Sequence, residues 1–220
     1  MLGANDRLSL VEHLDELRKR LFRIAFVLLA GVIIAGVFNS VLFKLLLSPL
    51  PLRFRHLTTF SPAEPFMVSF KVWVYCGLLI ASPFVIYQFW AFVGPAFSAN
   101  EKKYFYPVVA STAALFLGGV VFCYLIVLPR GLTWLLTFNG PYFNVQNRAQ
   151  EYFSFVAMFL LAFGAVFELP VVIVLAARLG IVDSKFLRKN RKYALLINAV
   201  IAAVATPSQD AFSMIACSFP

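Results

Sequence analysis

Charged residues are scarce in this sequence. They make up 13% of its 220 residues, against roughly 25% in a typical soluble domain, and 61% of the residues are hydrophobic. A soluble globule of this size would lack the polar residues to cover its surface, so the composition excludes a water-soluble enzyme, a disordered tail and a fibrous protein. What remains is a polytopic membrane protein. In such a protein, a net charge of +9 indicates basic residues at cytoplasmic helix ends more than nucleic-acid binding.

Residues that carry chemistry are also few. The three cysteines (Cys76, Cys123 and Cys217) lie far apart in apolar stretches, and the two histidines (His13 and His56) have no metal-ligand spacing. The sequence has no glycine-rich phosphate loop, no His-Glu-x-x-His motif and no Gly-x-Ser-x-Gly motif. We therefore expect no catalytic residue, no metal site and no cofactor, and we predict that the protein is not an enzyme.

Long apolar runs define the predicted architecture, a single all-α membrane domain over residues 1–220. Four runs, 21–38, 66–93, 104–128 and 152–177, are long enough to cross a bilayer core of about 30 Å. A fifth run, 193–205, has only 13 residues, or about 20 Å of helix, and the run 211–220 is too short to span, so we expect an incomplete sixth helix. A cytoplasmic amphipathic helix is predicted over residues 1–20, and a short interfacial helix over 42–47.

The distribution of Lys and Arg predicts the orientation. The N-terminal segment, the loop after the second run and the loop after the fourth run together hold 13 basic residues, and the opposite side holds 6. By the positive-inside rule, the N-terminus is cytoplasmic.

The N-terminal helix carries both an apolar stripe and a dense set of charges. Ser9 and Glu12 form a capping-box pattern, so we expect the helix to start near Ser9. Two interpretations of its carboxylates stay open. Asp15–Lys19 and Glu16–Arg20 could be ordinary i,i+4 ion pairs on a solvated face, or the carboxylates could attract an incoming cation at a basic membrane surface. The stripe consists of Leu10, Leu14, Leu17 and Leu21.

Glu168 is the second notable charge, because it lies well inside the fourth run. Such a residue usually faces a cavity or a partner and marks function, although a protonated glutamate bonded to another helix is the alternative. Pro170 should kink the helix beside it. Asp210 could be functional or only the N-cap of the sixth helix. Gln88 and Asn198 are more typical of hydrogen bonds between helices than of a binding site.

Several motifs together resemble one family. His13 to Leu21 reads HLDELRKRL, which resembles the N-terminal signature of TatC, the multispanning core of the twin-arginine protein translocase. The further matches are Ser48-Pro49-Leu50, Ser82-Pro83, the segment from Tyr87 to Ala96, Glu101, Phe163-Gly164, Phe167-Glu168-Leu169-Pro170, and Thr206-Pro207 with Asp210. The resemblance runs from about residue 10 to the end of the sequence.

The resemblance implies a six-helix concave bundle in the cell (inner or plasma) membrane, or in a thylakoid membrane if the source is a plastid. This chain would hold five full spans and the start of a sixth. It also implies a receptor for signal peptides that carry two consecutive arginines. The receptor would work with TatA and TatB in an oligomeric complex to export folded proteins, driven by the protonmotive force.

The resemblance also assigns roles to residues. Glu16 and Glu101 would bind the twin arginines, Arg18 would orient that site, and Phe92 would form an apolar wall for the signal peptide. Three further positions, Pro49, Glu168 and Asp210, would shape the outer cap, the concave face and the hairpin between the fifth and sixth helices.

One other class of function stays open. Glu168 could be the proton site of a proton-coupled small-solute transporter. Inverted repeats and paired broken helices would favour that reading, and the sequence has neither. A membrane enzyme would need a nucleophile or a metal set, which the sequence lacks.

Overall fold

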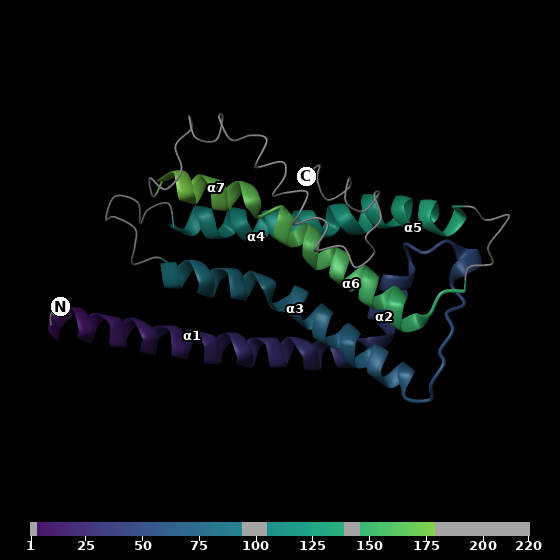
Figure 1. The fold of residues 1–220 in the computed structure, drawn as a ribbon, viewed down its shortest axis with the longest axis horizontal. Coiled ribbons are helices and arrows are strands. Elements are labelled where there is room, and N and C mark those ends of the chain that lie inside the picture. The colour runs from purple at the N-terminus through teal and green to yellow at the C-terminus, as the bar shows by residue number, and fades with distance from the viewer. Residues whose placement is uncertain (1–3, 94–104, 139–145, 179–220) are drawn as a thin grey trace.

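The computed structural model describes residues 4–93, 105–138 and 146–178, and the regular structure in these ranges consists of helices and one isolated β-bridge between Thr58 and Arg148. Figure 1 shows long helices packed side by side and connected at both ends. Within the described residues, four helical segments are long and apolar enough to cross a membrane. The elements are α1 (Ala4–Val37), α2 (Asn39–Leu47), η1 (Leu52–Phe54), α3 (Glu64–Val93), α4 (Phe105–Phe122), η4 (Cys123–Val127), α5 (Leu128–Thr137), α6 (Ala149–Val166) and α7 (Leu169–Arg178).

The predicted spans agree with these helices in number and position for the first four runs. The short helix predicted over 42–47 is confirmed and begins at Asn39. The third span is longer than predicted, because the π-helical turn η4 and helix α5 carry it on to Thr137. The predicted runs 193–205 and 211–220 lie outside the described residues.

Helix α1 differs from the prediction at its start. It begins at Ala4 rather than near Ser9, and it continues without a break into the membrane span. No proline interrupts residues 4–37, so nothing in the backbone separates a surface helix from the span. The leucines of the predicted stripe whose exposure is described, Leu14, Leu17 and Leu21, are exposed.

Helices α1 and α3 run antiparallel and make the most extensive helix–helix contact in the described chain. They approach most closely at two glycines. A Cβ atom built on Gly31 would lie 2.7 Å from the carbonyl oxygen of Gly77, and one built on Gly77 would lie 2.7 Å from the backbone nitrogen of Val32. Only glycine allows two helix backbones to come this near, a device common between membrane helices. This contact sets the register of α1 against α3.

Glycine also brings α4 and α6 together. A Cβ atom on Gly119 would lie 2.7 Å from the carbonyl oxygen of Phe163, and Gly164 packs against the ring of Phe116. The kink predicted at Pro170 is confirmed, because α6 ends at Val166 and a new helix begins only at Leu169. Proline cannot donate the backbone hydrogen bond that would continue α6.

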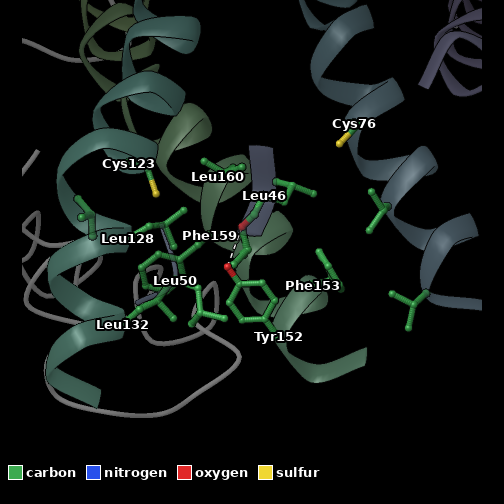
Figure 2. Packing of buried hydrophobic residues seen from close by; sticks show 14 of the residues in the cluster. Leu46, Leu50, Cys76, Cys123, Leu128, Leu132, Tyr152, Phe153, Phe159 and Leu160 are labelled. Carbon is green, nitrogen blue, oxygen red and sulfur yellow. Dashed lines mark hydrogen bonds between the residues drawn. The ribbon is translucent and has the colours of Figure 1, made fainter. Parts of the chain in front are cut away.

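The end of the bundle where α1 leads into α2 is closed by a cap, which comprises residues 39–63, with α2 and η1, and residues 146–148. Beneath it lies the buried core drawn in Figure 2, to which α2, α3, η4, α5 and α6 contribute. The hydroxyl of Tyr152 donates a 2.7 Å hydrogen bond to the carbonyl oxygen of Leu46 in this core. The indole of Trp73 donates a 2.9 Å bond to Asn39 Oδ1, so polar contacts as well as apolar packing hold the cap.

A buried ion pair ties the cap to α3 and α6. The Glu64 side chain is 2% exposed, and its Oε1 accepts a 2.8 Å hydrogen bond from Arg148 Nε. Its Oε2 accepts a second bond, 2.9 Å long, from the backbone N–H of Phe60. The hydrogen bond with Glu64 raises the pKa of Arg148. The pair thus joins segments that are 84 residues apart in sequence.

We expect Gly77→Ala to destabilise the protein by about 1–3 kcal/mol, the usual cost of overpacking a tight contact. The new methyl group would meet the backbone of α1, which cannot rotate away. Unfolding by SDS titration in mixed micelles would measure the change. Gly118→Ala is the matched control, because no atom lies within 4 Å of a Cβ atom at that position. Equal stability of the two variants would contradict the role of the glycine contact.

We expect Arg148→Met to cost about 3 kcal/mol in the same titration, near the lower end of the range for breaking a buried ion pair because Arg148 is itself partly exposed. The substitution leaves the buried Glu64 carboxylate without its counter-charge. Glu151→Gln should have almost no effect, because Glu151 is 76% exposed and lies 3.9 Å from Arg148. A loss of stability in Glu151→Gln as large as that in Arg148→Met would contradict the dependence of Glu64 on Arg148.

Candidate functional site

A polar network joins α1 and α3 at the end of the bundle opposite the cap. Arg20 donates from Nε (3.0 Å) and from Nη2 to the same oxygen, Oε1 of Glu16. Its third nitrogen, Nη1, donates a 3.1 Å bond across the helix boundary to Gln88 Oε1. The side chains of Arg20 and Glu16 are 17% and 38% exposed, and Gln88 is 4% exposed. The network is therefore half-buried and opens on its Glu16 side.

An aromatic contact lies beside this network. The rings of His13 and Phe92 are stacked, with centroids 4.4 Å apart and planes 24° apart. The spacing of His13, Glu16 and Arg20 places them on one face of α1, and Gln88 and Phe92 share one face of α3. These five residues are called the α1–α3 site below.

The glycine contact explains why these side chains meet. Arg20 lies 11 residues before Gly31, and Gln88 lies 11 residues after Gly77. Eleven residues make about three turns of helix, so both side chains return to the face on which the two glycines touch. Because the helices are antiparallel, equal offsets in opposite directions bring Arg20 and Gln88 to the same level.

The other charges of the N-terminal helix lie on the exposed part of α1. Lys19 pairs with Asp15 at 2.6 Å, and the guanidinium of Arg18 lies over the ring of Phe22, 5.7 Å from its centroid. Both predicted i,i+4 ion pairs are thus confirmed. Among the described contacts, Arg20 and not Arg18 is the arginine that holds Glu16.

The remaining predicted site residues are distributed over other parts of the chain. Pro49 is buried in the cap, at the far end of α1 from Glu16. Glu168 lies at the break between α6 and α7, and its Oε1 is buried with no hydrogen-bond partner among the described residues. Glu101 and Asp210 lie outside the described residues.

Two members of the α1–α3 site, His13 and Gln88, are not predicted as site residues from the sequence. His13 has no metal-ligand spacing and belongs to the HLDELRKRL motif, and its spacing from Glu16 is the signal that places both on one helix face. Gln88 was expected to make a hydrogen bond between helices, which is confirmed, but its partner could not be named. The partner depends on the register between two helices, which no local pattern encodes.

The chemistry of the α1–α3 site suits a planar cation. A carboxylate and a buried amide oxygen are its acceptors, and they already hold one guanidinium. The stacked rings of His13 and Phe92 add an apolar surface beside them. Within the described residues, no group of three His, Cys, Asp or Glu side chains could hold a metal ion.

The fold and this site define the class: an all-helical, multi-pass membrane protein with a small polar site at one end of its first two long helices. The model of the family "Sec-independent protein translocase protein (TatC)" matches residues 12–220. The chain belongs to the TatC family.

Similar proteins support this assignment over nearly the whole chain. The TatC protein of Carboxydothermus hydrogenoformans is 35% identical over 213 residues, which cover 97% of this chain and 88% of that protein. The TatC protein of Desulforapulum autotrophicum is 38% identical, with 100% of this chain and 82% of that protein covered. A crystal structure described as the twin-arginine translocase receptor TatC in DDM superposes with a TM-score of 0.84 at 35% identity, covering 94% of this chain and 93% of that one. The relatives' names describe protein transport.

Proposed function

We propose that this protein is the signal-peptide receptor of a twin-arginine translocase, and that the α1–α3 site binds the two consecutive arginines of the signal peptide. The observation that carries the proposal is the arrangement around Glu16. A carboxylate on the first helix, beside a buried amide oxygen on the second long helix, already binds one guanidinium in this chain. The family relationship supports the same role.

The chemistry explains a preference for arginine over lysine. A guanidinium is planar, is always charged and can donate two parallel hydrogen bonds to a carboxylate, whereas an ammonium offers only a point charge. The half-buried position of Glu16 strengthens such bonds relative to those of a fully exposed pair. We assign Glu101 as the second carboxylate, so that each arginine of the motif has its own acceptor.

The stacked rings of His13 and Phe92 provide an apolar surface for the hydrophobic region of the signal peptide, next to the twin arginines. Arg18 helps to orient the site from the exposed side of α1. The α1–α3 site faces the cytoplasm in this proposal, because the charge asymmetry of the sequence places the N-terminus there.

The remaining residues serve the export step. Glu168 supplies a polar group at the break between α6 and α7, where its Oε1 has no partner among the described residues. Pro49 shapes the outer cap, and Asp210 helps to form the hairpin where the single-span partners TatA and TatB dock. Export of the folded precursor is driven by the protonmotive force.

We expect the double variant Glu16→Ala/Glu101→Ala to lose binding of a twin-arginine signal peptide, measured by photo-crosslinking in membranes or by fluorescence anisotropy in detergent. Each single variant should weaken binding roughly 10- to 100-fold, because a hydrogen bond to a charged group is worth about 1.5–3 kcal/mol. A twin-lysine peptide should bind less well than the twin-arginine peptide to the wild type.

Asp15→Ala is the matched control for the binding experiment. It removes the same charge from the adjacent residue, but Asp15 is exposed and bound to Lys19. Wild-type binding in Asp15→Ala together with loss in Glu16→Ala would separate the site from the general charge of the helix. Equal crosslinking in the wild type and the double variant would refute the proposed binding site.

We expect Glu168→Leu to reduce export of a twin-arginine precursor severalfold and Glu168→Gln to retain most of it, because the proposal requires polarity at this position. Export is measured as the fraction of precursor processed on the far side of the membrane. Signal-peptide binding should be unchanged in both variants. Wild-type export by Glu168→Leu would reduce the role of Glu168 to a structural one.

A further inference from the structure

The carboxylate of Glu16 is already occupied by a guanidinium from its own chain. We infer that Arg20 is a resident competitor: it occupies Glu16 in the unliganded receptor and must yield to the first arginine of an arriving signal peptide. This inference rests on the proposed function and adds to it a residue that sets the threshold for binding.

Arg20 binds Glu16 in the same way that an arginine of the signal peptide would bind it. Two nitrogens of Arg20, Nε and Nη2, donate to one oxygen of Glu16, which is the contact that a signal-peptide arginine would otherwise make. At 17% side-chain exposure, Arg20 is far less solvated than Lys19, which is 67% exposed in its own pair with Asp15. Two neighbouring ion pairs of the same i,i+4 type thus differ in exposure, and only the less exposed pair lies in the α1–α3 site.

Gln88 gives Arg20 a second place to bind. Its amide oxygen accepts from Nη1 of Arg20, and as a neutral group it cannot cancel the charge of the guanidinium. Arg20 can therefore release Glu16 while it keeps its bond to Gln88, so it need not leave the interface. The buried position of Gln88 keeps this acceptor fixed while the exchange takes place.

The second oxygen of Glu16 provides the route for exchange. Both hydrogen bonds from Arg20 end on Oε1, and none of the described residues donates to Oε2. The peptide arginine can bind Oε2 first and take Oε1 when Arg20 turns fully to Gln88. An ammonium can make only the first of these contacts with good geometry. Because the first contact leaves Arg20 on Oε1, competition from Arg20 penalises arginine, which needs both oxygens, more than lysine.

A competitor in the same chain lowers the apparent affinity, because the peptide can bind only in the fraction of molecules whose site is free. Removing the guanidinium should therefore tighten the binding of a twin-arginine peptide, and should tighten that of a twin-lysine peptide less. This outcome is opposite to that expected if Arg20 only held Glu16 in a productive orientation, in which case its removal would weaken binding.

The test compares Arg20→Gln with Lys19→Gln, two variants that lose one positive charge at adjacent positions. The full chain in detergent is titrated with labelled twin-arginine and twin-lysine peptides. We expect Arg20→Gln to bind the twin-arginine peptide about tenfold more tightly than wild type, which corresponds to ~1.4 kcal/mol, and we expect a smaller gain for the twin-lysine peptide. Lys19→Gln should show only the small gain due to reduced net charge. Weaker binding by Arg20→Gln, or an equal gain in both variants, would overturn the inference.

Gln88→Met provides a second measurement that does not depend on removing Arg20. Without the amide oxygen, Arg20 has only Glu16 as a partner, so the peptide should bind severalfold more weakly. The same substitution in the Arg20→Gln background should have little effect, because no competitor remains. An equal loss in both backgrounds would mean that Gln88 acts independently of Arg20 and would contradict the exchange.

The inference and the proposed function fail in different ways. If Glu16→Ala binds the peptide as well as wild type does, the proposed binding site itself is wrong. If Glu16→Ala weakens binding but Arg20→Gln does not strengthen it, the site stands and only the resident competitor is refuted. A melting curve for each variant confirms that the compared proteins are folded.

Discussion

The contact between Gly31 and Gly77 determines the relation of α1 and α3, the two longest helices that the structure describes, and the positions of the α1–α3 site and of the entry into the cap follow from it. In a membrane, helices gain little from burying apolar surface against each other, because lipid is as apolar as the side chains. Close backbone approach, which strengthens dispersion contacts, takes the place of the hydrophobic effect. Without a side chain at either position, α1 and α3 can touch and keep a single register along their length.

That register has consequences at both ends of the helix pair. Toward the cap, Gly36 packs against the ring of Trp73, whose indole then reaches Asn39 at the start of α2. In the other direction, three turns away, the same register brings Arg20 to Gln88. One contact in the middle of the bundle therefore positions both the entry into the cap and the α1–α3 site.

The two ends of the bundle are held by different means. The cap is closed by a buried ion pair between Glu64 and Arg148 and by hydrogen bonds to the backbone, so its polar groups satisfy one another. At the opposite end, Glu16 keeps one oxygen without a hydrogen bond from the described residues, and its side chain is partly open to solvent. A closed network stabilises the fold, whereas the open network at Glu16 retains the capacity to bind. This contrast supports placing recognition at the α1–α3 site and not at the cap.

The sequence alone determined the features that depend on local composition and spacing. Hydropathy located the first four spans, the i,i+4 spacing identified the Asp15–Lys19 and Glu16–Arg20 pairs, and Pro170 indicated the break after α6. The motifs that resemble TatC indicated the family. Only the tertiary structure showed that Arg20 reaches Gln88, that His13 stacks on Phe92 and that Glu64 pairs with Arg148. These partners lie 68, 79 and 84 residues apart, and they meet because packed helices have a definite register, which is a property of surfaces in contact and not of any one segment.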